Sequence, residues 1–326
     1  MRLLKDLPGA IMAIGIRLTV DFVFKLVFGS PDHSRITIHF LNAILAGGPK
    51  IVHVTIRNPF LGKDFEDDKL SVLDILAEDE HGRLLNIEIQ TTLPAGMNQR
   101  LAYYASALLV DQLTEGTDYS SLRSAISICV LTQPMFPKVP DLHLEFQLRT
   151  STGLLLTDNL QVHLLELSKL SVTAENVSEA SPIEQWAYFM LNADKLTLED
   201  VKQTFSDREF TEAAGVLEMI SQNPEQQMRY DARLKFQRDE AARLELVREE
   251  ALREGEEKGI EKGIEKGRVE GESKGRREGE LLGQIKLLQQ LLGVPESTRE
   301  ELLSNDEARL KELSEELQRQ LRTRGV

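Results

Sequence analysis

Three polar residues interrupt apolar strand patterns at spacings that favour metal chemistry. In the stretch LSVLDILAEDEHGRLLNIEIQ, residues 70–90, Asp74 stands inside one apolar run, and Glu88 and Gln90 alternate with apolar residues in the next. Side chains alternate between the two faces of a strand, so Glu88 and Gln90 share one face and Asp74 shares a face with apolar neighbours. A carboxylate in apolar surroundings is expensive to bury unless it is paired or binds a metal ion.

The two carboxylates are expected to meet on neighbouring strands. Strands joined by a short turn lie about 4.8 Å apart, which brings Asp74 and Glu88 within reach of one cation. Mg²⁺ suits such a site, with Mn²⁺ or Ca²⁺ as substitutes, because it prefers one or two carboxylates together with water and substrate phosphate oxygens. Taken alone, this spacing is more often that of an edge hairpin with solvated acids. The surrounding elements are therefore needed to decide between such a hairpin and a metal site.

Hydrophobic periodicity predicts the order helix, three strands, helix, strand around these residues. The helices are expected at 21–28, from Pro31 to a stop at Gly47, and at 97–113; the strands at 51–60, 70–77, 83–90 and 124–131, with further candidates near 142–148 and 161–167. Asp74 and Glu88 therefore fall on the second and third strands of an α/β domain.

The second half of the chain reads as helical. Amphipathic patterns follow residue 180, and glycine then stands at every fourth position from Gly255 to Gly283. Each interior glycine disfavours helix by roughly 0.8–1 kcal/mol against alanine, so a frayed, solvated spacer is one reading. The other is a self-association or partner-docking segment, because a glycine stripe lets a second helix approach closely. We expect four parts: an α/β domain at 17–170, a helical extension at 171–254, the glycine repeat as a helical or disordered tail at 255–283, and short helices at 284–326.

Composition restricts the class of protein. The chain has 326 residues, 41% hydrophobic and 28% charged, which is typical of a soluble globular protein, and no apolar run approaches the roughly 20 residues of a membrane span. Cys129 is the only cysteine, so no internal disulfide forms and a cytoplasmic location is expected. The net charge of −14 argues against nucleic-acid binding. Residues 1–170 contribute only −4 of it, from 15 Lys and Arg against 19 Asp and Glu.

Several longer stretches resemble the recombination-promoting nuclease and transposase family, a branch of the PD-(D/E)XK nucleases found on bacterial chromosomes. They are DFVFKLVFG at 21–29, FLNAIL at 40–45, RLAYYASALL at 100–109, the hairpin around Asp74 and the glycine repeat. The resemblance implies a restriction-endonuclease-like α/β core, made of helix, three strands, helix and strand, followed by an all-helical C-terminal extension. It also implies metal-dependent cleavage of DNA that promotes recombination or transposon-like mobility, with nucleoid association.

The resemblance carries specific roles to matched positions. Asp74 and Glu88 become metal ligands, and Gln90 takes the place of the motif lysine. A glutamine can orient a water molecule but neither accepts a proton near neutral pH nor supplies positive charge. Either a second metal ion generates the hydroxide, or a lysine from elsewhere reaches in. Lys25 of the FK motif is the first candidate, with a surface ion pair to Asp21 as the equally weighted alternative.

Two further residues are candidates for DNA contact, and two other functions compete with the nuclease. Arg100 and Tyr103 on the helix after the third strand would contact phosphate and stack on a base, although a core tyrosine with a solvated arginine is at least as good a reading. A catalytically silent DNA-binding or assembly module is favoured by the missing lysine and the acidic balance. A homo-oligomer built through the C-terminal helices is the third reading. The six histidines show no zinc-ligand spacing.

Overall fold

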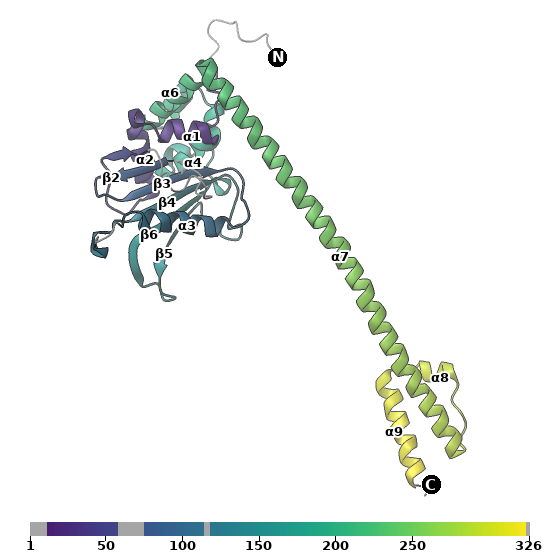
Figure 1. Ribbon diagram of the computed structural model, residues 1–326. Coiled ribbons are helices and arrows are strands. Elements are labelled where there is room, and N and C mark those ends of the chain that lie inside the picture. The colour runs from purple at the N-terminus through teal and green to yellow at the C-terminus, as the bar shows by residue number, and fades with distance from the viewer. Residues whose placement is uncertain (1–11, 58–74, 114–117, 324–326) are drawn as a thin grey trace, which may run out of the picture. The chain divides into compact units, whose positions relative to one another are not determined.

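The computed structural model describes residues 12–57, 75–113 and 118–323. The described part of the N-terminal half contains one six-stranded sheet in the order β1-β2-β3-β4-β6-β5 (Figure 1). Its strands are β1 Val54–Ile56, β2 Ile75–Asp79, β3 Leu84–Gln90, β4 Ala125–Leu131, β5 His143–Arg149 and β6 Leu155–Glu166. The β1, β2 and β3 strands are antiparallel neighbours, β3, β4 and β6 run parallel, and β5 is antiparallel to β6.

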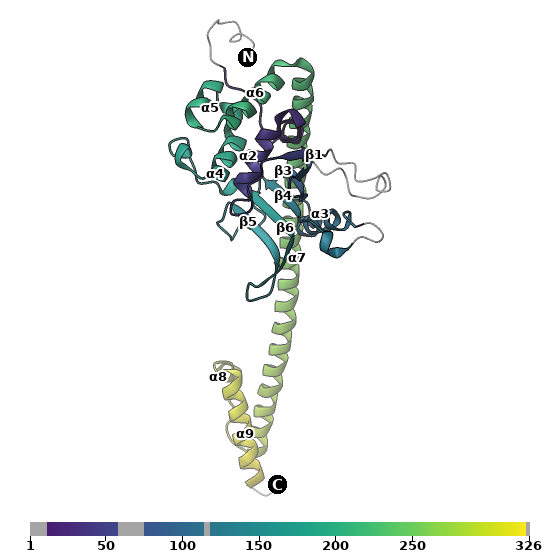
Figure 2. The same ribbon diagram turned by 90° about the vertical axis from the view of Figure 1, so that its left-hand side faces the viewer.

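Helices cover both faces of this sheet. The bounds are α1 Asp21–Phe28, α2 Ser34–Ile44, α3 Met97–Val110, α4 Pro182–Asn192, α5 Leu198–Thr204 and α6 Arg208–Gln222. The views in Figures 1 and 2 place α3 on one side of the sheet and α1, α2, α4 and α6 on the other. The mixed α/β class predicted from the sequence is therefore confirmed.

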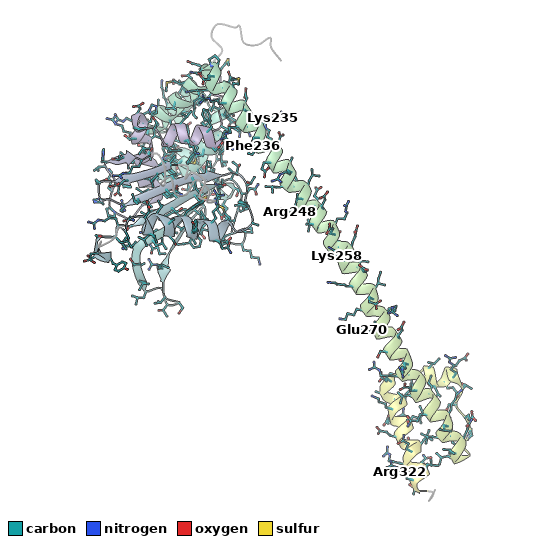
Figure 3. The ribbon with its side chains drawn as sticks, viewed as in Figure 1. Lys235, Phe236, Arg248, Lys258, Glu270 and Arg322 are labelled. Carbon is teal, nitrogen blue, oxygen red and sulfur yellow. The ribbon has the colours of Figure 1, made fainter. Side chains whose placement is uncertain are left out.

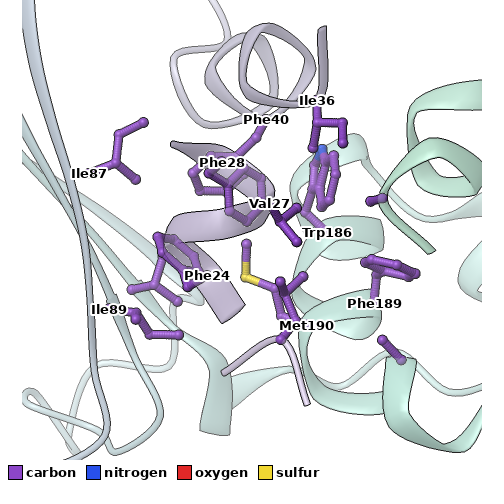
Figure 4. Packing of buried hydrophobic residues seen from close by; sticks show 14 of the residues in the cluster. Phe24, Val27, Phe28, Ile36, Phe40, Ile87, Ile89, Trp186, Phe189 and Met190 are labelled. Atoms are coloured by element: carbon purple, nitrogen blue, oxygen red, sulfur yellow. The ribbon is translucent and has the colours of Figure 1, made fainter. Parts of the chain in front are cut away.

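The larger core lies between the sheet and α1, α2, α4 and α6. In α1 the spacing of Val23, Phe24, Val27 and Phe28 puts four apolar side chains on one buried face. Figure 4 shows Phe24 and Phe28 beside Ile87 and Ile89 of β3, the alternate residues that point to this side of the sheet.

Trp186 of α4 contacts the three other helices of this layer, α1, α2 and α6. Its ring centroid lies 5.4 Å from that of Phe28 and 4.4 Å from that of Phe210 in α6. Its indole Nε1 donates a 3.0 Å hydrogen bond to Nδ1 of His39 in α2. Aromatic pairs of this kind contribute about 0.5–1.5 kcal/mol beyond their burial, so α1, α2, α4 and α6 pack as one layer behind β3.

Two strands differ from their predicted bounds by more than two residues within the described part of the chain. Only Val54–Ile56 of the expected strand at 51–60 is assigned to β1 among the described residues. The β6 strand begins at Leu155, six residues before the expected start. Its first half joins exposed Leu155 and Leu156 to a Thr-Asp-Asn run of residue types common in turns, and it pairs with β5 across register shifts at Gln147 and Leu148, so no alternating pattern marks it in the sequence.

The chain divides into two compact units, residues 1–241 and 242–326. One long helix, α7 Pro224–Leu292, begins in the first unit and ends in the second, and the glycine repeat lies within it. In the second unit, α8 Arg299–Leu303 and α9 Glu307–Thr323 pack beside the last turns of α7 (Figure 1). This cluster buries Ile285, Leu288, Leu292, Leu302, Leu310 and Leu317. The predicted C-terminal helical region is confirmed.

Among the described residues, the apolar content of every helix falls short of what crossing a membrane requires.

Candidate functional site

Glu88 and Gln90 lie side by side on the face of β3 that turns away from the main core. The Gln90 side-chain amide Nε2 donates a 3.4 Å hydrogen bond to Glu88 Oε2. Glu88 is 2% exposed and Gln90 is half-buried. Ile87 and Ile89 alternate with them and point to the opposite side, where they anchor β3 in the core. The strand therefore holds a buried carboxylate in place through apolar contacts made behind it.

The same face continues inward with polar residues that lack partners. Asn86 and Ser127 are fully buried and pair in parallel register on β3 and β4. Neither the Asn86 amide atoms nor the Ser127 hydroxyl has a hydrogen-bond partner among the described residues. Buried polar groups without partners are rare because each costs about 1–3 kcal/mol. A polar line of Asn86, Glu88 and Gln90 thus runs along β3.

Helix α3 covers this side of the sheet and carries the predicted DNA contacts. Tyr104 is the buried tyrosine of the pair, whereas Tyr103 is 51% exposed. The guanidinium carbon of half-buried Arg100 lies 5.1 Å from the centroid of the Tyr104 ring, a cation–π distance. One face of α3 therefore packs on the sheet while Tyr103 remains accessible.

The remaining predicted residues are placed differently. Asp74 lies outside the described residues; Ile75, the first residue of β2, pairs with Ile87. Lys25 is half-buried in α1, a helix that packs on the face of β3 opposite to Glu88. Its motif neighbour Asp21 is 3.9 Å from Arg233 of α7. The structure thus brings together Glu88 and Gln90.

The donor chemistry of this face fits a hard divalent cation. A carboxylate oxygen from Glu88 and amide oxygens from Gln90 and Asn86 are the ligand types that Mg²⁺ accepts. Among the described residues, no three His, Cys, Asp or Glu side chains gather into a metal-binding group. On this face of β3 those residues offer the one carboxylate of Glu88.

The structure also joins two histidines that the sequence spacing did not connect. His143 Nε2 lies 3.0 Å from His163 Nδ1, and the two rings stack with centroids 5.2 Å apart. Burial, with His143 close by, lowers the pKa of His163 to about 3, and burial also lowers the pKa of His143. The pair is therefore neutral near pH 7, one ring donating to the other. The sequence could have shown the contact of the two histidines only through the register of β5 and β6. That register pairs Glu145 with His163, and His143 lies two residues from Glu145 on β5.

A family model described as PD-(D/E)XK nuclease family transposase matches residues 18–246 of the chain. The matched region contains all six described strands and continues into α7, five residues beyond the end of the first compact unit at residue 241. Comparisons with curated proteins and with solved structures find no match.

Proposed function

The chain belongs to the PD-(D/E)XK nuclease family transposases, and from this membership we propose that it is a divalent-metal-dependent DNA endonuclease. In this proposal it hydrolyses phosphodiester bonds in the service of recombination or transposon-like mobility. Mg²⁺ is the proposed cofactor, with Mn²⁺ or Ca²⁺ as substitutes at the same ligands. DNA is the proposed substrate.

The observation that carries the proposal is the buried Glu88 carboxylate, hydrogen-bonded by Gln90 on a polar strip of β3. A carboxylate with 2% exposure is expensive unless it is charge-compensated. We propose Asp74 as the second metal ligand. The antiparallel register of β2 and β3 ends, within the described residues, at the pair Ile75 and Ile87, and it supports this because one further pair in the same register would match Asp74 with Glu88.

Each residue then has a defined task. Glu88 and Asp74 hold the cation, which lowers the pKa of a bound water and offsets charge on the phosphate when it is present. Gln90 orients the attacking water through its amide but cannot remove a proton from it. We assign the missing positive charge to Lys25 because of its place in the FK motif; its helix α1 packs on the face of β3 opposite to Glu88, so the lysine would reach the site past the end of that strand. Arg100 and exposed Tyr103 are proposed to contact the phosphate and a base of the substrate.

Plasmid cleavage with Mg²⁺ or Mn²⁺ tests the assignment. Glu88→Gln and Asp74→Asn keep the side-chain size but remove a negative ligand. Each is expected to lower the cleavage rate at least about 100-fold, because loss of a residue that only hydrogen-bonds to a metal ligand already costs up to about 100-fold. Glu145→Gln, on an exposed position of β5, is the matched control and is expected to cleave like wild type. Wild-type cleavage by Glu88→Gln contradicts the site, and cleavage that survives chelation of the metal contradicts the chemistry.

A catalytically silent DNA-binding or assembly module is the second candidate. The observation in its favour is Gln90 itself, an uncharged amide bound to Glu88 where the motif has lysine. Such a module binds DNA without cutting it under any metal, and its affinity is unchanged by Glu88→Gln. A gel-shift measurement run beside the cleavage assay separates the two functions.

A further inference from the structure

A pocket of about 330 Å³ lies just past the ends of β3 and β4. Its floor includes Thr91 and Thr132, the residues that directly follow Gln90 and Leu131 at the strand ends. Its walls come from the segment before α1, from the turn after α4 and from the first part of α7. The lining residues that carry the argument are Arg17, Thr19, Thr91, Thr132, Lys195 and Arg238.

Hydrogen bonds between distant segments build this pocket. Thr132 donates its backbone N–H to the Gln90 carbonyl at 3.1 Å and its hydroxyl to the Thr91 carbonyl at 3.3 Å, which fixes the two strand ends. The backbone N–H of Arg17 donates to the hydroxyl of buried Tyr230 in α7 at 3.2 Å. The pocket is therefore built from segments of the first unit that these bonds hold together, with the first part of α7 as one wall.

The charge of the pocket is opposite to that of the chain. Three cationic side chains, Arg17, Lys195 and Arg238, line it together with a single acid, Asp194, although the whole chain carries −14. Asp194 Oδ2 binds Nε of Arg17 at 3.2 Å and so orients its guanidinium. A guanidinium has five N–H donors in a planar fork that matches phosphate, so one carboxylate contact leaves capacity for an anion. The threonine hydroxyls add neutral donors.

We propose that this pocket binds a backbone phosphate of the DNA substrate at the ends of β3 and β4. The inference rests on the proposed function and deepens it. The pocket begins one residue beyond Gln90, at the ends of β3 and β4, and its lining comes from the side of the sheet on which α1 and α4 pack, past the face that carries Glu88. The first turns of α7 then belong to the substrate site, which agrees with a family match that continues to residue 246.

The test compares two substitutions on one exposed stretch of α7. Arg238→Gln removes a cation from the pocket, whereas Lys235→Gln removes one that lies outside the lining (Lys235 is labelled in Figure 3). Binding of a short fluorescent duplex to the full chain is measured by anisotropy in Ca²⁺ over a series of salt concentrations. Arg238→Gln is expected to weaken binding on the order of tenfold at 0.1 M salt and to reduce the slope of log K against log[salt] by about one, as for one lost phosphate contact. Lys235→Gln is expected to retain the wild-type slope, and Arg17→Gln to repeat the Arg238→Gln result.

The outcomes separate this inference from the proposed function. If wild type binds and cleaves DNA but both arginine variants bind with the wild-type slope, the phosphate pocket is rejected and the nuclease stands. If wild type binds DNA without cleaving it and Arg238→Gln reduces the slope of log K against log[salt], the pocket stands and the catalytic proposal is rejected. A wild-type chain that does not bind DNA overturns both. Calorimetry with inorganic phosphate is the remaining arm: binding that Arg238→Gln abolishes, with an unchanged DNA slope, indicates a small phosphorylated ligand and overturns the DNA assignment.

Discussion

At the scale of single residues, the polar strip on β3 lowers the stability of the fold. Asn86 and Ser127 are fully buried and without hydrogen-bond partners among the described residues, directly beside Glu88 on the same face. A purely structural strand would be more stable with apolar side chains at these positions, because an unsatisfied buried donor or acceptor costs about 1–3 kcal/mol. Such residues are typical of a site that serves binding or catalysis.

The first prediction follows from this cost. Asn86→Leu replaces an unpartnered amide by an apolar group of similar size and is expected to raise the free energy of unfolding by about 1–2 kcal/mol. The same change is expected to lower metal-dependent cleavage, because an amide oxygen beside Glu88 is lost. Urea denaturation and the plasmid assay measure the two effects. A destabilised Asn86→Leu would mean that the amide has a structural partner.

The missing lysine gives a second prediction, in the form of a rescue. If Lys25 supplies the positive charge, Lys25→Gln lowers the cleavage rate, and adding Gln90→Lys to that variant restores it, because the lysine then stands beside Glu88 on β3. The expected loss and recovery are about 100-fold, the usual lower value for a group that assists proton transfer. Lys202→Gln, a distant lysine in α5, is the control. Failure of Gln90→Lys to rescue, with DNA binding intact, removes Lys25 from the charge-supplying role.

The buried histidine gives a third prediction, for the dependence of stability on pH. The pKa of His163 is lowered from 6.5 to about 3, so between these pH values the unfolded chain binds a proton that the folded chain excludes. The free energy of unfolding therefore falls as pH falls, by up to about 1.4 kcal/mol per pH unit, and this contribution is complete only above about pH 6.5.

Comparison with a variant isolates the effect of this one group. From pH 6.5 to 4.5 wild type is expected to lose about 2 kcal/mol more than His163→Gln, which has no titrating side chain there. Carboxylates that titrate in both proteins cancel in the difference. Substitution of exposed His53 by Gln serves as the control and is expected to follow wild type. Parallel curves for wild type and His163→Gln would show that His163 titrates normally in the folded chain.

At the scale of elements, the sequence was informative where one period dominated. Apolar alternation in β3, the continuous apolar run of β4 and the helical spacing in α1 predicted those elements within a residue or two. Prediction failed where no alternation is present, as in the first half of β6, where exposed leucines adjoin turn-type residues and pairing with β5 stabilises the strand. Likewise, Glu88 and Gln90 are neighbours by period alone, whereas the phosphate pocket joins residues 17, 91, 195 and 238 and has no local signature.

The glycine-bearing part of α7 is the element whose local energetics conflict with its structure. Eight interior glycines disfavour helix by roughly 6–8 kcal/mol against alanine. Ion pairs such as Lys258–Glu254, Lys266–Glu270 and Arg268–Glu272 recover only about 0.3–0.5 kcal/mol each. Exposed Ile260 and Ile264 directly follow glycines on this stretch. We therefore propose that the helix is stabilised by self-association with a second copy of the chain.

The fourth prediction uses the space around these glycines. A Cβ added at Gly259 or Gly263 meets no described atom within 4 Å, so alanine creates no clash within one chain. In a solitary helix each substitution raises helix stability by about 0.8–1 kcal/mol. If two helices approach closely along the stripe, Gly259→Ala with Gly263→Ala instead lowers the oligomer mass in light scattering. We expect the lower mass; a monomeric wild type, or an unchanged mass with increased helicity, excludes the glycine stripe as the contact.

At the scale of the whole molecule, the boundary between the two units separates two apolar cores. The first unit has its own core and contains nearly all of the matched family region, whereas the second buries a separate apolar cluster. Tyr230 and Leu234, in the first turns of α7, pack on the core of the first unit. The α7 helix therefore belongs to both units, and its first turns should be indispensable for the fold of the first unit.

The last prediction tests this division with two truncations. A chain ending at residue 246 keeps Tyr230, which is 5% exposed, as well as Arg238 of the phosphate pocket, and is expected to fold and cleave with the rate per site of the full chain. A chain ending at residue 222 loses the buried tyrosine ring and the partner of the Arg17 backbone N–H. Loss of a buried aromatic side chain costs about 3–5 kcal/mol, so the shorter chain should melt at a clearly lower temperature and lose DNA binding. Equal melting temperatures for the two truncations would show that α7 contributes nothing to the first unit, and they would remove the structural basis for placing it beside the substrate.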